Sequence, residues 1–548
     1  MASKVESPIR LLLLLLFVPA LVFLTGCDSG SNGGGGDEEK GLLDPGPVET
    51  DQTTKELDTN DDGSTDRVRV TDVNAQGIAP SSADDQKVTW TSDKTYELNG
   101  FVFVNSNETL TIEAGTEIQG RLGGGSDASA LIVASGGKII AEGDPDNPIV
   151  FTSVRAEEEN LGRNDRGLWG GVILLGDAET NNDRRVAIEG VPDGTGSRIN
   201  YGGSNNSHNV GTLKYVSIRH TGTQLGNGDE IQGLTLGGVG AGSTIEYVES
   251  YASDDDGFEW FGGTVNTKHL IAAFASDDAF DIDQGYRGSN QFWLAVQGGN
   301  KAGRASEMDG AGDAGATPIA QSIIANATYI GMGPGVSNPS GDANDPFIIH
   351  RDDNATSYYN SIFTGGRTDA GIQIEDINGT QDASDRWDGD QNGSPASGDP
   401  LKHVDNTWHN IGPNFSASSS PTASDFEQLV QVTRNNENNN NATGDRGESL
   451  IGDLATYFAN NGHQLAGSDP LESIDRGGNN GAVQTFDPGT AGSVSSSTTA
   501  PSDFGTESPG VNDNFVSVSE RGAFASSASW NLNGWTKIKS ETQELQGE

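Results

Sequence analysis

The side chains best suited to chemistry lie in two acidic runs that repeat one another. The first run contains Asp254, Asp255, Asp256 and Glu259, and the second contains Asp277, Asp278, Asp281 and Asp283. Phe258 and Phe280 follow the same offset, 280 − 258 = 22 positions. Glu307 and Asp309 are candidates for a third copy after an insertion. Because like charges repel at short range, closely spaced carboxylates need screening water, a shared proton or a bound cation.

Three interpretations of these carboxylates stay open. Hard oxygen ligands in a cluster favour Ca²⁺, and the expected ligands are Asp255, Asp256, Asp277 and Asp278. Paired carboxyl groups could instead act as acid and base on a polysaccharide, and the candidates are Glu259, Asp281, Asp283 and His220. The third interpretation is a structural acidic face without a ligand.

Two further segments have the ligand spacing of calcium loops. The first resembles the D-x-N-x-D-G-x-x-D loops of dockerin and thrombospondin-type repeats, with ligands at Asp58, Asn60, Asp62 and Asp66. The second resembles an EF-hand loop with aspartate in the twelfth position, with ligands at Asp388, Asp390, Asn392 and Asp399. Each segment also fits a solvated turn rich in Asp, Asn and Gly, so calcium is a hypothesis in both.

The acidic runs alternate with apolar side chains, which is the pattern of β-strands. In FEWF and FDID, Phe258 and Phe280 share a face with the residues two positions on, while the acids share the other face. A repeat of about 22 residues with Gly/Asp turns predicts the stacked coils of a β-solenoid. Equivalent residues of neighbouring coils would lie about 4.8 Å apart. We therefore expect a stacked aromatic core and a ladder of carboxylates on the outside.

Aromatic side chains near the acidic runs are candidates for sugar binding. Tyr286, Phe292 and Trp293 could form a platform on which a sugar ring stacks. Trp260 keeps the phase of Phe258, which predicts packing in the core instead.

Basic side chains offer fewer candidates. Arg287 and Arg304 are available as bases for a lyase, but nothing in their spacing selects them. His220 and His350 each stand beside an arginine at the end of a predicted coil. A lone histidine is more often structural than catalytic, so the structural role is the first expectation for both, with His220 kept among the catalytic candidates.

The charge balance limits the partners. The 548-residue chain has 32 Lys and Arg against 79 Asp and Glu, a formal charge of −47. Such a charge repels nucleic acid and anionic lipid, and it suits cations or a high-salt environment. Only 33% of the residues are hydrophobic and 76 are glycine, which fits narrow coils with many turns. We therefore expect no nucleic-acid partner.

The first 27 residues have the features of a bacterial lipoprotein signal peptide. Lys4 and Arg10 form a basic region that precedes an apolar run at 11–23, and this run is too short to span a membrane. Leu-Thr-Gly-Cys resembles a lipobox, whose cysteine thiol carries the lipid, here Cys27. Residues 28–57 are typical of a flexible acidic tether. We expect a lipid-anchored envelope protein, at the outer membrane or cell surface rather than the periplasmic face of the inner membrane.

Several stretches resemble a group of bacterial secreted or lipid-anchored right-handed parallel β-helix proteins. They are ETLTIEAGTEIQG, ALIVASGGKIIAEGDPDNPIVFTS, RGLWGGVILLG, GTLKYVSIRHTG, DDGFEWFGGTVNTKHL and RGAFASSASWNLNGWT. The resemblance covers roughly residues 96–540. It implies an all-β chain, a right-handed parallel β-helix with long loops and an irregular, partly helical C-terminal cap. It implies no particular activity, because most members are uncharacterised.

The expected organisation has five parts. They are the signal peptide (1–27), the tether (28–57), an Asp-rich loop and N-terminal cap (58–95), the β-helix (96–415) and a C-terminal extension and cap (416–548). In the extension, apolar spacing predicts helices at 425–432 and 448–460. Trp530 and Trp535 are expected to pack over an open coil edge.

The functional expectation is a monomeric, non-enzymatic, Ca²⁺-binding scaffold or adhesin-like module that contacts polysaccharide or surface glycans. The alternative is a polysaccharide lyase or glycoside hydrolase that uses the aligned carboxylates. The fold does not decide between them, because β-helices support both roles.

Overall fold

A computed structural model of the chain describes much of residues 51–548, which form one compact unit. The described residues are 54–57, 66–71, 87–191, 196–226, 229–298, 301–310, 315–337, 346–377, 382–387, 401–433, 449–475, 485–490, 514–518, 520–524 and 530–546. Within these ranges no helix combines the length and the apolar composition that crossing a membrane requires. The expected signal peptide, Cys27 and most of the tether lie outside the described residues.

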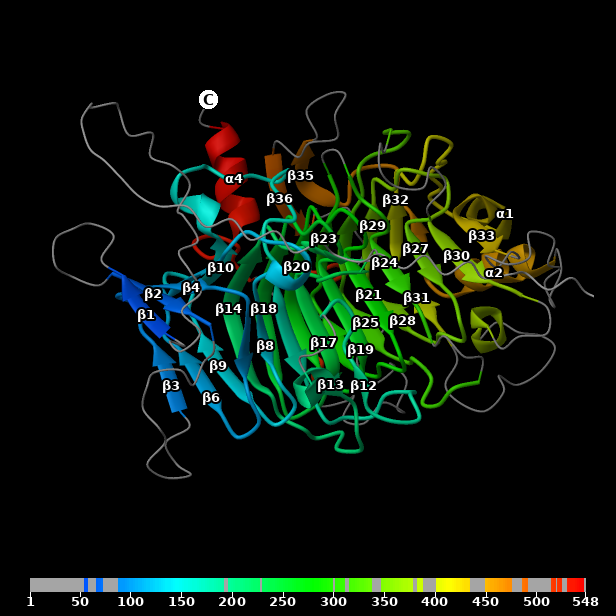
Figure 1. The fold of residues 1–548 in the computed structure, drawn as a ribbon. Helices are drawn as coiled ribbons and strands as arrows, with labels where there is room; N and C mark the ends of the chain where they lie inside the picture. The colour runs from blue at the N-terminus through cyan, green and yellow to red at the C-terminus, as the bar shows by residue number, and fades with distance from the viewer. Residues whose placement is uncertain are drawn as a thin grey trace, which may run out of the picture. The chain divides into compact units, whose positions relative to one another are not determined.

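Short parallel strands stack along the chain into two large sheets, which makes this unit a parallel β-helix (Figure 1). Sheet B contains β5 (Phe101–Val104), β8 (Ala130–Val133), β11 (Val172–Leu175), β17 (Leu234–Val239), β19 (Phe258–Gly263), β21 (Phe280–Asp283), β24 (Ser306–Met308), β27 (Ile348–His350), β30 (Ile372–Glu375) and β33 (Val430–Thr433).

Sheet A consists of two rows of strands. The first row contains β3 (Lys87–Trp90), β6 (Thr109–Ile112), β9 (Lys138–Glu142), β22 (Ser289–Gln291), β25 (Ile323–Ala325), β28 (Ser357–Tyr359) and β31 (His403–Val404). The second row contains β1 (Thr54–Leu57), β2 (Arg67–Val70), β4 (Thr95–Leu98), β7 (Glu117–Gly120), β10 (Ile149–Ser153), β23 (Leu294–Val296), β26 (Thr328–Ile330), β29 (Ile362–Thr364), β32 (Thr407–His409) and β34 (Gln464–Leu465). Three long strands run through both rows, namely β14 (Gly211–Arg219), β18 (Thr244–Tyr251) and β20 (Thr267–Ala273).

Smaller elements lie in the connections. They are the strands β12 (Val186–Ala187), β13 (Asn200–Tyr201), β15 (Gln224–Gly226), β16 (Asp229–Glu230), β35 (Leu471–Asp475) and β36 (Thr485–Thr490), the α-helices α1 (Ala423–Phe426), α2 (Ser449–Asn460) and α4 (Lys537–Gln546), and the 3₁₀ turns η1 (Gly125–Asp127), η2 (Val154–Glu157), η3 (Gly196–Ile199), η4 (Ala383–Arg386) and η5 (Glu427–Leu429).

The interior of the coils is a continuous stack of apolar side chains. The rings of Phe258 on β19 and Phe280 on β21 have centroids 5.5 Å apart. Phe280 in turn lies 4.4 Å from the ring of Trp293. Trp260 is fully buried in the same cluster. The predicted aromatic core, with Trp260 in it, is confirmed.

Sheet A bends where its two rows meet, at single residues with positive φ. These are Tyr215 (51°), Tyr247 (56°), His269 (57°), Phe292 (62°), Asn326 (55°) and Asn360 (53°). This conformation is uncommon for residues with a side chain and needs support from neighbours. For the four ring residues, from Tyr215 to Phe292, the support comes from stacking, because the centroids of successive rings are 4.5, 4.2 and 5.0 Å apart.

Trp530 and Trp535 cover these stacked rings from outside. The ring of Trp530 lies 5.0 Å from that of His269, and the ring of Trp535 lies 5.7 Å from that of Tyr215. Both tryptophans therefore pack on the side of the coils, and the expectation that they close an open coil edge is wrong. The bend residues present a ladder of stacked rings there, and the two tryptophans pack against it.

The stack of strands is longer at both ends than the expected 96–415. Ahead of residue 96, β2 pairs with β4 and β3 pairs with β6, and beyond residue 415, β33 pairs with β30. β33 occupies 430–433, so the predicted helix at 425–432 is partly wrong, and only 423–429 is helical. A free sheet edge offers backbone partners that override local apolar spacing. The second predicted helix is confirmed as α2.

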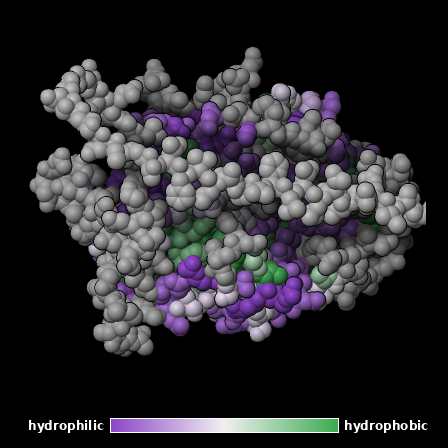
Figure 2. Space-filling model, viewed as in Figure 1, coloured by the Kyte–Doolittle hydropathy of each residue, from purple (hydrophilic) through white to green (hydrophobic). Residues whose placement is uncertain are grey.

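A loop with the strands β12 and β13 covers the outer side of the first strands of sheet B. Its residue Tyr201 lies 6.1 Å, between ring centroids, from Phe261 on β19. The approach is close, since a Cβ added to Gly237 on β17 would meet the Tyr201 ring at 2.8 Å. Figure 2 shows hydrophobic surface as a patch bordered by hydrophilic residues.

Candidate functional site

Three strands of sheet B align acidic side chains on its outer side. Glu259 on β19 pairs in register with Asp281 on β21, and Asp281 pairs with Glu307 on β24. On each strand the residues directly before and after the acid point into the core, so these three acids project outward. The acidic ladder and its candidate third copy are therefore confirmed in register.

Asp256, Glu259 and Asp281 form a compact group on this face, and we call them the acidic centre. Each offers a carboxylate oxygen that lies within 4.8 Å of the others. Glu259 is 6% exposed and Asp256 is 8% exposed. The ladder therefore lies on the outer side of the coils as expected, but its members Asp256 and Glu259 are buried there. Connections fold over this part of sheet B, which the strand repeat alone does not reveal.

Two oxygens of the acidic centre have no hydrogen-bond partner within the described part of the chain. They are Oε2 of Glu259 and Oδ1 of Asp281, and both atoms are buried. A buried polar atom without a partner is destabilising by about 1–3 kcal/mol, and more when it is charged. A proton or a cation would satisfy these oxygens.

Two arginines contact the neighbouring acids Asp278, Glu307 and Asp309, which we call the arginine-paired acids. The NH1 atom of Arg304 lies 3.3 Å from Oδ2 of Asp278 and 3.1 Å from Oε2 of Glu307. Arg351 lies 3.1 Å from Oε1 of Glu307 and 2.8 Å from Oδ2 of Asp309. In the described residues no ion pair reaches Asp256, Glu259 or Asp281.

The pKa values of these groups follow their surroundings. Burial, and then the charge of Asp281, raises the pKa of Glu259 well above its usual range. Burial, and then Glu307, does the same to the pKa of Asp281. Burial also opposes ionisation of Glu307, yet Arg304 and Arg351 hold its pKa below the usual value. Without a cation, the acidic centre therefore retains protons that the arginine-paired acid Glu307 has lost.

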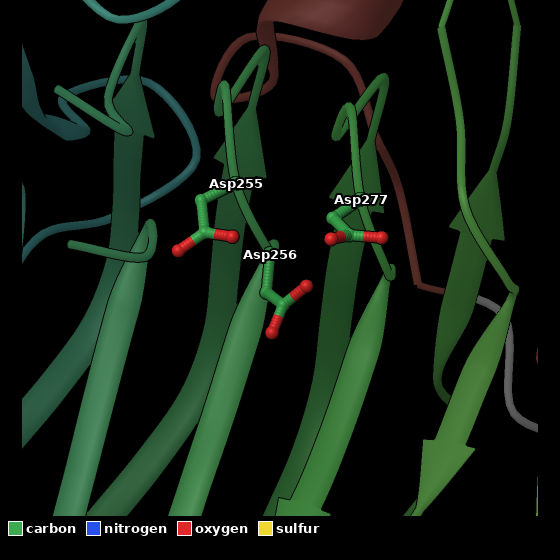
Figure 3. Close-up of side chains that lie close together, drawn as sticks. All are labelled: Asp255, Asp256 and Asp277. Atoms are coloured by element: carbon green, nitrogen blue, oxygen red, sulfur yellow. The ribbon is translucent and has the colours of Figure 1, made fainter. Parts of the chain in front are cut away.

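Asp255 and Asp277 lie on equivalent turns before β19 and β21. Figure 3 shows them side by side above Asp256, with carboxylate oxygens of all three within 4.8 Å of one another. The turns are held together by the backbone N–H of Asp278, which donates to Oδ1 of Asp256 at 2.8 Å. Asp277 is exposed and Asp255 is half-buried, so water can screen these two carboxylates.

The other predicted site residues do not join the acidic centre. The Nδ1 atom of His220 contacts the backbone oxygen of Asp165 at 2.6 Å, and burial lowers its pKa to about 4. His350 is fully buried beside His403. These contacts are structural, because none involves an acid of sheet B.

The proposed sugar platform is wrong. Tyr286 and Trp293 are fully buried and Phe292 is 1% exposed, so no ring face is open to a sugar. The backbone bends at Phe292, whose φ is 62°, and the next residue, Trp293, lies in the core.

The two predicted calcium loops fall largely outside the described residues. Of the first loop only Asp66 is described, and it borders a polar pocket next to Arg67 and Lys94. The remaining ligands lie outside: Asp58, Asn60, Asp62, Asp388, Asp390, Asn392 and Asp399. Both loops stay predictions.

Sequence reasoning missed the role of Arg351 and assigned Arg304 no contact. Ile349 on β27 is the register partner of Glu307, so its side chain lies on the outer side of sheet B. Arg351 is two residues further on, and alternation therefore places it on the same side, next to the acids. The register of β24 and β27 is therefore the signal that would have identified it.

Comparison with known proteins now adds the family. Residues 82–448 match the family described as a pectate-lyase-like β-helix domain. The chain belongs to this family. No curated protein and no solved structure matches it. Membership agrees with the parallel β-helix and points to a carbohydrate-related role.

Proposed function

We propose that this protein is a lipid-anchored component of the bacterial cell envelope whose β-helix binds Ca²⁺ at the acidic centre and contacts glycans without cleaving them. The observation that carries the cation site is the pair of buried oxygens without partners, on Glu259 and Asp281. Ca²⁺ takes about 6–8 oxygen ligands, which three carboxylates and water can supply. Family membership supports the glycan contact.

Burial favours ion binding over catalysis at this site. A polysaccharide must bring a glycosidic bond to the catalytic carboxyl groups, whereas a cation needs only their oxygens. Glu259 is 6% exposed, which leaves little room for a sugar chain. The acidic centre is accordingly a site that organises the fold around an ion.

Thermal unfolding of the full chain tests the cation site. We expect CaCl₂ to raise the melting temperature relative to NaCl at matched ionic strength, since a ligand that binds only the folded state stabilises it. At a concentration 100 times the dissociation constant the gain is about 2.7 kcal/mol. Equal stabilisation by both salts would instead mean salt adaptation and would remove the cation site.

The lipid anchor has its own test. We expect a labelled fatty acid to be incorporated into the protein through Cys27 and lost in the Cys27→Ser variant, which should leave the membrane fraction. Labelling that survives the substitution would contradict the anchor. Surface proteolysis of intact cells then separates the outer membrane or cell surface from the inner membrane.

A lyase or hydrolase is the second candidate, and the closeness of Glu259 to Asp281 favours it. Their carboxylate oxygens lie within 4.8 Å, close enough for one group to hold a proton that the other lacks. An enzyme of this kind would release reducing or unsaturated ends from acidic polysaccharides, and Asp281→Asn would abolish that activity. Unchanged release by the variant would exclude this centre as catalytic.

A further inference from the structure

The first row of sheet A carries lysines on its outer side, on a surface that we call the lysine face. The burial of its strands alternates, and in β9 Lys138, Ile140 and Glu142 are exposed while the residues between them are buried. Four lysines project from this face, namely Lys87, Lys138, Lys214 and Lys268. Lys87 and Lys138 are exposed, and Lys214 and Lys268 are half-buried.

Parallel pairing arranges these side chains in straight rows along the stack. One row runs Lys87, Thr109, Lys138. The next row runs Thr89, Thr111, Ile140, Thr212, Thr244. The third row runs Glu142, Lys214, Glu246, Lys268. Lysines recur every second coil within the first and third rows, a spacing of about 10 Å.

This face has the opposite charge balance to the rest of the chain. The protein has 32 Lys and Arg against 79 Asp and Glu, yet the rows contain four lysines and two glutamates. Unlike Lys301, which pairs with Asp254, none of the four lysines has an ion-pair partner among the described residues. A patch of positive charge on an acidic protein directs a polyanion to one surface and repels it elsewhere.

Two other outer surfaces of the β-helix are covered by described parts of the chain. The first strands of sheet B are covered by residues of the β12–β13 loop, including Ile188, Ile199 and Tyr201. Outer residues of the second row of sheet A, such as Ile271 and Leu294, pack against the C-terminal segment. On the lysine face, by contrast, Lys87 and Lys138 are exposed, and the stacked, half-buried rings of Tyr215 and Tyr247 border this face.

We propose that the lysine face binds an anionic polysaccharide that lies along the axis of the stack. Lysines about 10 Å apart suit a polymer with one carboxylate in each disaccharide, and the threonines of the row between them offer hydroxyl groups to sugar oxygens. The inference rests on the proposed glycan contact and names its partner class and its surface. It does not involve the acidic centre, which lies on a different sheet.

Sodium hyaluronate, which has one carboxylate in each disaccharide, is the probe, with neutral dextran of equal length as the comparison. Binding to the immobilised full chain is measured in chelator at low and at physiological salt. We expect hyaluronate to bind, dextran not to bind, and affinity to fall as salt rises. The variant Lys138→Gln/Lys214→Gln/Lys268→Gln should bind at least about tenfold more weakly, which corresponds to about 1.4 kcal/mol.

Two variants serve as controls. Lys94→Gln/Arg155→Gln/Arg185→Gln removes three positive charges away from the lysine face and should change the affinity by less than about twofold. Glu259→Gln/Asp281→Asn should also keep hyaluronate binding, because the acidic centre is elsewhere. Circular dichroism checks that each variant is folded.

The outcomes separate this inference from the proposed function. If hyaluronate binds but the lysine variant binds equally well, the lysine face is excluded while the glycan contact stands. If dextran binds and hyaluronate does not, the anionic partner is wrong while the glycan contact again stands. If duplex DNA binds as tightly as hyaluronate, the face is a non-specific polyanion surface and the inference fails. Absence of binding to both glycans would contradict the glycan contact and the inference with it.

Discussion

The outer side of sheet B has two halves that are buried by different chemistry. In the apolar half, Phe103, Ile132 and Ile173 pack under the β12–β13 loop in one hydrophobic cluster. In the acidic half, the equivalent outward positions are the buried Glu259 and the half-buried Asp281, each with one buried oxygen that lacks a hydrogen-bond partner among the described residues. The strands, their direction and their register are the same in both halves.

The comparison shows that burying an outward position is not stabilising in itself. Apolar side chains gain about 25 cal/mol for each Å² that leaves water, and any close-packed cover will supply that. Carboxylates lose hydration and require a specific partner. Arg304 and Arg351 provide it for Glu307, whereas no ion pair reaches the acidic centre within the described residues, and a cation there is our proposal.

The sharpest test exchanges the chemistry of the two halves. Ile132→Asp puts a carboxylate at a fully buried site in the apolar half, where the cluster offers no cation. We expect the free energy of unfolding to fall by about 4 kcal/mol or more, measured by urea denaturation. Ile132→Val, which keeps the site apolar, should lower it by only about 1 kcal/mol. A loss below about 1 kcal/mol for Ile132→Asp would mean that the cover is not packed as described.

Removing an arginine should leave arginine-paired acids without an ion-pair partner, as the acids of the acidic centre are. Arg304→Met leaves Asp278 and Glu307 without the guanidinium that contacts both. We expect a loss of about 3 kcal/mol in the free energy of unfolding, because a buried charge loses its partner. Arg155→Met, which removes an arginine paired with Glu159 at a more exposed site, should change stability by less than about 1 kcal/mol. Similar losses in both variants would contradict the neutralising role of Arg304.

Removing charge from the acidic centre should have the reverse effect. In chelator, Glu259→Gln/Asp281→Asn should be as stable as the wild type or more so, because two buried carboxyl groups that are costly to ionise are replaced by neutral amides. In CaCl₂ the variant should lose the gain of about 2.7 kcal/mol that is expected at 100 times the dissociation constant. Calorimetric titration measures the binding directly. A variant that still binds Ca²⁺ with wild-type affinity would place the ion elsewhere.

The pH dependence of stability should also show that buried carboxyl groups on this face hold their protons. Burial, followed by the charge of Asp309, raises the pKa of Asp283 to about 7. The folded chain therefore keeps a proton that the unfolded chain releases near pH 4, so stability falls as pH rises from about 4 to about 7. In chelator, Asp283→Asn should flatten this fall relative to the wild type, as measured by melting temperature at each pH. Parallel curves for the two proteins would rule out Asp283 as its source.

The smallest effect is expected at the turn shown in Figure 3. Asp255→Asn changes a half-buried carboxylate beside the exposed Asp277, where water already screens the charge. We expect the stability to change by less than about 0.5 kcal/mol and the affinity for Ca²⁺ to change little. A loss of Ca²⁺ binding as large as in Glu259→Gln/Asp281→Asn would move the ion to the turn.

Much of the coil geometry was predictable because strand alternation and stacking are local and periodic. The 22-residue offset placed Phe258 on Phe280 and Glu259 on Asp281, and both pairings are observed. The exposure of those acids was not predictable, because it depends on loops that come from distant parts of the chain. The predicted sugar platform failed for the same reason, since the bend at Phe292 depends on its stacking on His269.

Amino-acid order was sufficient for the coil, its repeat and the alignment of acids, since each follows from short-range alternation and a constant offset. Which acids receive an arginine, which are covered by a connection and which face stays open were decided by tertiary contacts. Those outcomes depend on side chains far apart in the sequence, such as Asp278 and Arg304 or Glu307 and Arg351, and on the low dielectric that forms only when the covering segments exclude water.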